Sequence, residues 1–317
     1  MHPSDLLRDL IQGRGSTHQL SSYIALIAGL RRSLDDWIPP DRLDSWTRIA
    51  ARLGLTVIPD CLFCDLAGAP YTGVVPTTRA TAEPWRSGAS SGSRGMVHVF
   101  VSSSRERAEE ALAAGWYSLV VHGRPITKPL VDHGRLGMAF GYPECCVKFF
   151  MSRNDWPRWN TLAESFKASR QTLWECNCLT KHTPCMMIYH MPCSFDCSAT
   201  TAYSRSLFEV IRSVSEGYAE RVRDSSIGTF LTVNEVVTYR LVSAQLSDVD
   251  ASISYRRAFY LGSYHENDNL GRLLSRGDRI LIQSGTVFVY RGRDLVGTSD
   301  ARCDLGSMDV PLLLRFA

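Results

Sequence analysis

Seven of the ten cysteines of this chain fall between residues 145 and 197. They occur in short spacings, with Cys145 next to Cys146, and Cys197 four residues after Cys193. Soluble proteins usually bury single cysteines as small apolar side chains. Several thiolates must converge on one centre to bind a soft metal ion or an iron–sulfur cluster. The spacing therefore predicts a metal site in this part of the chain.

The first pair follows a proline that is placed to begin a helix. Gly141 ends a helix predicted over residues 129–140, and Pro143 is expected to be the first residue of the next helix. Cys145 and Cys146 then lie in its first turn. The free amide groups and the positive end of the helix dipole lower the pKa of a thiol there, which favours the metal-binding thiolate.

The second pair follows Pro192 and has two alternative conformations. If a helix begins at Pro192, Cys193 and Cys197 lie one turn apart on one helix face. If the segment is instead a loop that enters the long helix predicted over 200–223, Cys197 lies near the N-terminus of that helix. Either conformation offers two thiolates to one centre. The expected metal ligands are Cys145, Cys146, Cys193 and Cys197.

These ligands favour a [4Fe–4S] cluster, because amide donors at helix N-termini stabilise an anionic cluster. Zinc bound by four cysteines, or by three cysteines and His190, is the alternative. Structural zinc sites usually use Cys-x-x-Cys pairs, and neither pair has that spacing. Disulfides, redox thiols and packed cysteines are the remaining interpretations. A reducing compartment disfavours disulfides.

Several neighbouring residues are secondary candidates. His190 is the candidate catalytic residue, because it lies about one helical turn before Cys193; the alternative is a hydrogen-bonded core histidine. Glu144 and Asp196 are expected to complement helix dipoles rather than to carry protons. The other cysteines have three interpretations. Supporting or spare thiols are expected at Cys176, Cys178 and Cys185. A redox or metal-binding CxxC pair is expected at Cys61 and Cys64, and a packed thiol at Cys303.

The composition excludes some classes of protein. The 317 residues are 44% hydrophobic and 21% charged, which is typical of a soluble globular protein. A net charge of +3 provides no bulk attraction to nucleic acid or to an anionic membrane. The N-terminus lacks the features of a signal peptide, and no run of apolar residues is long enough to span a membrane. We therefore expect a cytoplasmic protein without a membrane partner.

The fold class is expected to be α/β or α+β. The expected parts are a helical N-terminal region over 1–66, a linker or long loop over 67–95, an α/β region with the cysteine-rich helical segment over 96–225, and a β-rich region over 226–317. Within the first region, Asp41 is expected to cap a helix that Gly54 ends, before a strand over 55–59.

Two smaller units have clear patterns. A strand over 96–101, a helix over 104–114 and a strand over 117–122 predict a central parallel pair with a crossover helix. Near the C-terminus, strands over 280–283 and 286–290 are separated by Ser284 and Gly285, which predicts a hairpin.

The motifs Gly-Tyr-Pro-Glu-Cys-Cys, ending at Cys146, and His-Met-Pro-Cys-Ser-Phe-Asp-Cys, ending at Cys197, resemble the signature of an uncharacterised prokaryotic cysteine-rich family. The resemblance covers only the cysteine-rich segment. It implies that the two motifs belong to one site. It carries over no catalytic residue, because the function of that family is unknown.

The leading hypothesis is a bacterial, cytoplasmic enzyme that holds an iron–sulfur cluster and acts on a small molecule. Its chemistry is expected to be sulfur transfer or removal, or Lewis-acid lyase or hydratase chemistry, with a biosynthetic role. The alternative is a zinc-stabilised module that binds RNA or protein, with nucleic acid the less favoured partner. The radical-SAM pattern is absent, because residue 200 is threonine. Substrate and oligomeric state are left open.

Overall fold

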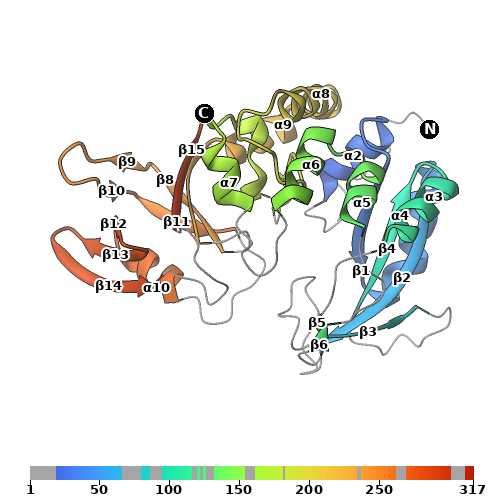
Figure 1. Cartoon of the computed structure of the whole chain (residues 1–317), viewed down its shortest axis with the longest axis horizontal. Coiled ribbons are helices and arrows are strands. Elements are labelled where there is room, and N and C mark those ends of the chain that lie inside the picture. The colour runs from blue at the N-terminus through green and yellow to red at the C-terminus, as the bar shows by residue number, and fades with distance from the viewer. Residues whose placement is uncertain are drawn as a thin grey trace. The chain divides into compact units, whose positions relative to one another are not determined.

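The computed structural model describes residues 19–65, 80–85, 95–115, 120–121, 124–125, 132–153, 161–180, 183–233, 237–261, 269–300 and 311–317. The expected mixture of helices and strands is confirmed, with helices in the middle and a β-rich C-terminal part (Figure 1). Contacts divide the chain into two compact units, and each is described by itself. The four-part division expected from the sequence stays a prediction.

The N-terminal unit is built on a sheet of four strands in the order β1-β4-β2-β3 (Figure 1). These strands are β1 (Ser33–Ile38), β4 (Met96–Ser102), β2 (Thr56–Asp65) and β3 (Ala80–Pro84). The strands pair antiparallel throughout. Successive side chains of a strand point to opposite faces, so β4 contributes to two apolar layers, whereas the core residues of β1 belong to one of them.

Helices provide the partners of both layers. Leu34, Val99 and Val101 pack with side chains of α2 (Leu20–Ile27) and α3 (Leu43–Arg52). On the other face, Phe100 packs with side chains of α4 (Arg105–Ala113) and α5 (His133–Ala139). The sheet therefore has a hydrophobic core on each side, and α5 leads directly into the first cysteine motif.

The expected parallel pair is wrong. Both edges of β4 are occupied by antiparallel neighbours, β1 on one side and β2 on the other. Residues Val120–Val121 form β5, which pairs antiparallel with β6 (Arg124–Pro125) instead. Helix α4 is confirmed, and its N-cap Ser104 accepts a hydrogen bond from the Arg107 amide. Among the described strands, α4 therefore has no parallel partner of β4 to cross over to.

Other differences concern the N-terminal region. Strand β1, with all six residues buried, lies where helices are expected. Arg42 rather than Asp41 is the N-cap of α3, because Asp41 lies in the preceding 3₁₀ turn η1 (Pro40–Arg42). Gly54 follows the end of α3 with φ of 73°, as its predicted role requires. Strand β3 lies within the segment expected to be a linker or loop.

The C-terminal unit contains two antiparallel sheets, in the orders β11-β8-β7-β15 and β14-β13-β12-β10-β9. The strands are β7 (Gly228–Thr232), β8 (Thr238–Val242), β9 (Gln245–Leu246), β10 (Ile253–Ser254), β11 (Arg257–Tyr260), β12 (Arg279–Gln283), β13 (Thr286–Arg291), β14 (Asp294–Asp300) and β15 (Leu312–Phe316). The β12–β13 hairpin is confirmed. Ser284 and Gly285 both have positive φ, as a two-residue hairpin turn requires.

Helical segments of this part surround the second cysteine motif in sequence. They are α7 (Thr161–Lys167), η3 (Trp174–Cys176), η4 (Cys178–Thr180), α8 (Ser198–Val214), α9 (Glu216–Ser226) and α10 (Asn269–Arg276). The single helix expected over 200–223 is thus two helices, separated at Ser215. No helix within the described ranges is both long and apolar enough to cross a membrane.

Candidate metal centre

The first cysteine motif begins with a tight turn between α5 and α6 (Glu144–Arg153). The Tyr142 amide donates to the Gly137 carbonyl and the Gly141 amide donates to the Met138 carbonyl. These two bonds form a Schellman motif, whose C′ residue must adopt positive φ. Gly141 meets that requirement with φ of 73°. The turn therefore explains the Gly-Tyr-Pro sequence before the cysteines.

Pro143 then starts α6. Its carbonyl accepts hydrogen bonds from the amides of Cys146 and Val147, so Pro143 is the N-cap and Glu144 the first helical residue. Cys145 and Cys146 lie in the first turn, as predicted. Cys145 is exposed, Cys146 is buried, and their sulfur atoms lie 3.9 Å apart.

Close packing of α5 against α6 depends on Gly137. A Cβ atom there would lie 2.8 Å from Cγ2 of Val147. We expect Gly137→Ala to lower the free energy of unfolding by about 1–3 kcal/mol, because one helix must move away from the other. Denaturant unfolding measures this effect. Gly217→Ala in α9 is the control, since no atom lies within 4 Å of its added Cβ and it should stabilise its helix by about 0.5–1 kcal/mol. A neutral Gly137→Ala would contradict the close packing.

The second motif is a turn that enters α8, so the loop alternative is the one observed. The Cys197 amide donates to the Ser194 carbonyl, and the Cys197 carbonyl accepts from the Thr201 amide. Cys197 is therefore the N-cap of α8 and is buried, while Cys193 is half-buried in the turn. Of this second pair, Cys197 alone lies at a helix N-terminus, where the helix dipole favours the thiolate.

Neighbouring segments fix this turn through hydrogen bonds and one buried ring. The Phe195 amide donates to the Ser169 hydroxyl at 2.6 Å, and the Leu173 amide donates to the Phe195 carbonyl at 2.9 Å. The Ser165 hydroxyl donates to the Pro192 carbonyl. The ring of Phe195 is fully buried. The backbone between the two cysteines is thus held by residues upstream in the sequence.

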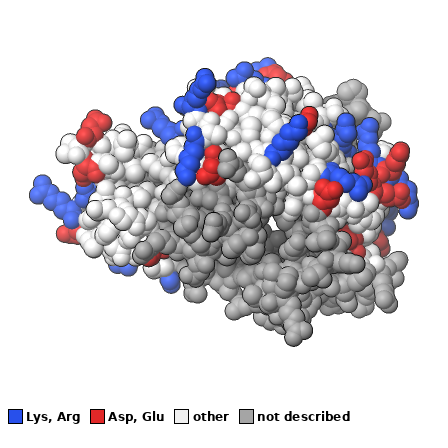
Figure 2. Space-filling model, in the orientation of Figure 1, with Lys and Arg blue, Asp and Glu red and all other residues white. Residues whose placement is uncertain are grey.

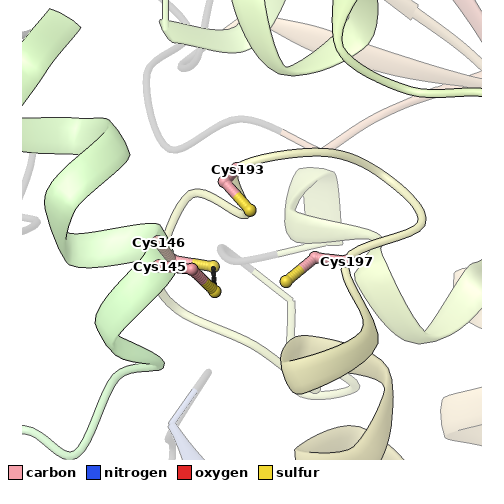
Figure 3. Close-up of side chains that lie close together, drawn as sticks. All are labelled: Cys145, Cys146, Cys193 and Cys197. Carbon is pink, nitrogen blue, oxygen red and sulfur yellow. Dashed lines mark hydrogen bonds between the residues drawn. The ribbon is translucent and has the colours of Figure 1, made fainter.

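The four cysteines form one group. The sulfur atoms of Cys145, Cys146, Cys193 and Cys197 all lie within 4.8 Å of one another, and they point toward a common centre (Figure 3). Within the described residues, no other group of histidine, cysteine or acidic side chains meets the same spacing. Four thiolates at this distance could hold a metal ion.

No protein-family model, curated protein or solved structure matches this chain. The chemistry of the centre is therefore interpreted from its own residues. The resemblance to the uncharacterised cysteine-rich family stays a prediction.

His190 lies outside this group of ligands. Its side chain is buried, and Nε2 lies 3.0 Å from Oγ1 of Thr200 in the first turns of α8. The ring also contacts Tyr203, with centroids 6.4 Å apart. These contacts are those of the core histidine named as the alternative in the sequence analysis. A catalytic role stays a prediction.

The two acidic neighbours make local contacts. Glu144 is exposed, and a hydrogen bond from Lys148 at 2.6 Å lowers the pKa of its carboxyl group. A hydrogen bond from Ser194 lowers the pKa of Asp196, whose Oδ2 also accepts from the Arg170 amide at 3.1 Å. Both groups are therefore carboxylates near neutral pH.

The other described cysteines have different surroundings. Cys176 is fully buried, and burial raises its pKa to about 12; its Sγ lies 3.4 Å from Oγ1 of Thr201. The Sγ of Cys178 lies 3.7 Å from Sδ of Met191. Burial likewise raises the pKa of Cys61, in β2, to about 12. Cys176 and Cys61 are thus neutral thiols rather than reactive thiolates. The side chain of Cys64, and Cys303, lie outside the described residues.

A separate polar cluster is buried in the N-terminal sheet. The imidazole of His98, with no exposed surface, lies 3.0 Å from Oδ2 of Asp60 through Nδ1 and 3.5 Å from Oδ2 of Asp35 through Nε2. Asp60 is next to Cys61 in an irregularity of β2, where the register with β4 shifts between Pro59 and Leu62. The irregularity is typical of a β-bulge, which redirects a side chain.

The charge states of this cluster follow from burial and hydrogen bonding. Burial alone would lower the pKa of His98, but hydrogen bonds to Asp35 and Asp60 outweigh it and the pKa is raised. Burial alone would raise the pKa of Asp35, but the hydrogen bond and charge of His98 outweigh it and the pKa is lowered. A carboxyl group thus faces each ring nitrogen of the buried imidazole, and this arrangement favours the charged form of His98.

Proposed function

We propose that Cys145, Cys146, Cys193 and Cys197 bind one Zn²⁺ ion through four thiolates, and that the chain is a zinc-stabilised module. The observation that carries the proposal is the 4.8 Å limit on the separations of the four sulfur atoms. Tetrahedral zinc with Zn–S bonds of about 2.3 Å places its sulfur ligands about 3.8 Å apart. In a [4Fe–4S] cubane each cysteine binds a different iron, so the sulfur atoms lie farther apart. The spacing supports a single ion.

Local electrostatics also support an all-thiolate site. Four thiolates around a divalent ion carry a net negative charge. The first turn of α6 and the N-cap of α8 offset that charge, because free amide groups and the positive helix end face these positions. The salt bridge with Lys148 partly neutralises the carboxylate of Glu144, which is next to Cys145 in sequence.

The expected role of the ion is to join α6 to the turn before α8. Closing a loop of about 47 residues, from Cys146 to Cys193, stabilises a folded chain by about 4 kcal/mol in the chain-entropy description of a cross-link. This value is a substantial fraction of the roughly 5–15 kcal/mol by which a typical domain is stable. Removing the metal should therefore lower the stability of the chain markedly.

Surface charge gives little support to an RNA partner. Figure 2 shows acidic and basic side chains interspersed over the described part of the face in view, without a field of one sign. Non-specific binding to a nucleic acid depends on such a positive field. The face in view therefore gives no support to RNA as the partner of the module.

The second candidate is the iron–sulfur enzyme, acting on a small molecule by sulfur transfer or removal or by lyase or hydratase chemistry. One observation favours it. Cys145 is exposed, whereas Cys146 and Cys197 are buried and Cys193 is half-buried. A catalytic metal keeps one position open to solvent or substrate, and a structural zinc site is closed. An exposed ligand is the one most readily replaced by substrate.

Metal analysis of protein purified without oxygen separates the two candidates. The zinc module should be colourless, contain one zinc per chain and lack acid-labile sulfide. Iron with sulfide and a brown colour would overturn the zinc proposal and support the enzyme. Absence of both metals would overturn both candidates. Cys185→Ser is the control variant, because this half-buried cysteine lies outside the four-sulfur group and its loss should leave the metal content unchanged.

A further inference from the structure

Arg31 is a buried cation far in sequence from the cysteines, and it contacts the turn that precedes them. Its side chain is only 4% exposed. Nε donates to the Ser33 carbonyl at 2.8 Å, Nη1 to the Ser22 hydroxyl at 3.0 Å, and Nη2 to the Tyr142 hydroxyl at 3.2 Å. A buried charge is costly unless its donors are bonded. The guanidinium therefore fixes the groups that satisfy it.

Two aromatic rings of the turn also contact Arg31. The guanidinium carbon lies 5.3 Å from the centroid of the Phe140 ring and 5.2 Å from that of Tyr142. Both distances are within the range of a cation–π interaction. Because Phe140 and Tyr142 flank Gly141, Arg31 holds the turn on both sides of its positive-φ residue.

The backbone of the turn is equally close to this segment. A Cβ atom on Gly141 would lie 3.5 Å from the backbone nitrogen of Arg32 and 3.7 Å from Cα of Arg31. Only Pro143 and Glu144 separate Tyr142 from Cys145. Pro143 has a fixed φ and is the N-cap of α6. The position of Tyr142 therefore sets the start of the helix that carries the first two thiols.

We propose that Arg31 is the positioning residue of the metal centre. By binding Phe140 and Tyr142 it fixes the α5–α6 turn, so that Cys145 and Cys146 present their sulfur atoms before the metal arrives. A ligand pair fixed in advance loses less conformational entropy on binding. Arginine suits this role because its planar group holds five donors in a fixed geometry and stacks on rings, whereas the ammonium group of lysine has three donors on a flexible stem. The inference rests on the proposed function of the four cysteines as ligands of one metal ion.

A matched pair of variants tests it. Tyr142→Phe and Ser22→Ala each remove one hydroxyl that accepts from the Arg31 guanidinium, but only Tyr142 belongs to the turn. The measurement is the zinc dissociation constant in competition with a chelator, with the visible spectrum of the Co²⁺-loaded chain as a report of thiolate geometry. We expect Tyr142→Phe to weaken zinc binding about tenfold and to alter the Co²⁺ spectrum, and Ser22→Ala to do neither. Arg31→Met should weaken binding more, and Arg31→Lys should restore little of it.

The outcomes separate the inference from the proposed function. Unfolding of the metal-free chain is measured in parallel, so that a loss of fold is distinguished from a loss of metal affinity. If Tyr142→Phe and Ser22→Ala weaken zinc equally, or neither does, Arg31 is not a positioning residue although the zinc site stands. If the wild-type chain binds zinc no better than Cys197→Ala, the proposed function fails, and the inference with it.

Discussion

Replacing Cys197 with alanine is expected to weaken zinc binding by at least about 100-fold, whereas replacing Cys145 should leave a zinc site of reduced affinity. Cys197 is buried at the N-cap of α8, where water does not readily take the place of its sulfur atom. Cys145 is exposed, so a water molecule can complete the tetrahedron in Cys145→Ala. Three protein ligands and one water are a stable arrangement for zinc. The exposure of the ligands thus predicts unequal contributions.

Zinc retained per chain after dialysis against chelators of increasing affinity measures this difference. Cobalt spectra report whether Cys145→Ala keeps a tetrahedral site. Cys185→Ser should behave as the wild type. Equal losses in the Cys145 and Cys197 variants would contradict an exposed, replaceable ligand. Full zinc retention in Cys197→Ala would contradict the four-thiolate site, and with it the proposed function.

Replacing His98 with asparagine is expected to lower the free energy of unfolding by about 3 kcal/mol and to remove part of its pH dependence. The variant removes the imidazole that is bonded to buried Asp35, although the charge of Arg31 still acts on that carboxylate. The pKa of His98 is raised in the folded chain above the value of 6.5 for a free side chain. Its stabilising contribution is therefore complete below pH 6.5 and is lost as the pH rises through the folded pKa.

Urea unfolding at about pH 6 and about pH 8 checks this expectation, because the window spans the titration of histidine. The measurement uses metal-free chains, because thiolate binding of a metal also depends on pH. The contribution of His98 to stability should be smaller at the higher pH, so the difference in stability between the two pH values should change in His98→Asn. His190→Asn is the matched control, since this buried histidine is bonded to the Thr200 hydroxyl rather than to carboxylates. An unchanged pH dependence in His98→Asn would show that the pKa of His98 is the same in the folded and the unfolded chain, which would contradict the raised pKa.

The lowered pKa of Asp35 changes stability with pH in the opposite direction from the raised pKa of His98. Its contribution to stability is complete above 3.8, the value for a free aspartate, and is lost as the pH falls through the folded pKa. The two contributions together are therefore present between about pH 4 and pH 6.5.

The helix boundaries at the first cysteine motif were predictable because their causes are local. Gly141 and Pro143 specify the end of one helix and the start of the next within three residues. The four expected ligands also form one group. This grouping was predictable from the type of residue rather than from local structure, because clustered cysteines have few other uses in a long chain. Gly137 carried a usable signal as well, because a glycine inside a helical pattern indicates close packing.

Features that depend on distant partners were not predictable. Strand β1 is buried along its whole length, so it lacks the alternation of polar and apolar residues that identifies a half-buried strand. The antiparallel neighbours of β4 are set by pairing between segments far apart in sequence. For the same reason nothing local marks Arg31, whose bond to Tyr142 spans 111 residues.

The sequence separation of the two cysteine pairs has a consequence during synthesis of the chain. The segments that carry Arg31, α5 and the first turn of α6 have all left the ribosome once Val147 has done so, but Cys193 leaves it 46 residues later. At translation rates of about 5–20 residues per second, that delay lasts about 2–10 s. During this interval the nascent chain presents two adjacent thiols, 3.9 Å apart in the folded protein, without their partners. The order of translation thus exposes Cys145 and Cys146 to oxidants and to competing metal ions before the site can close.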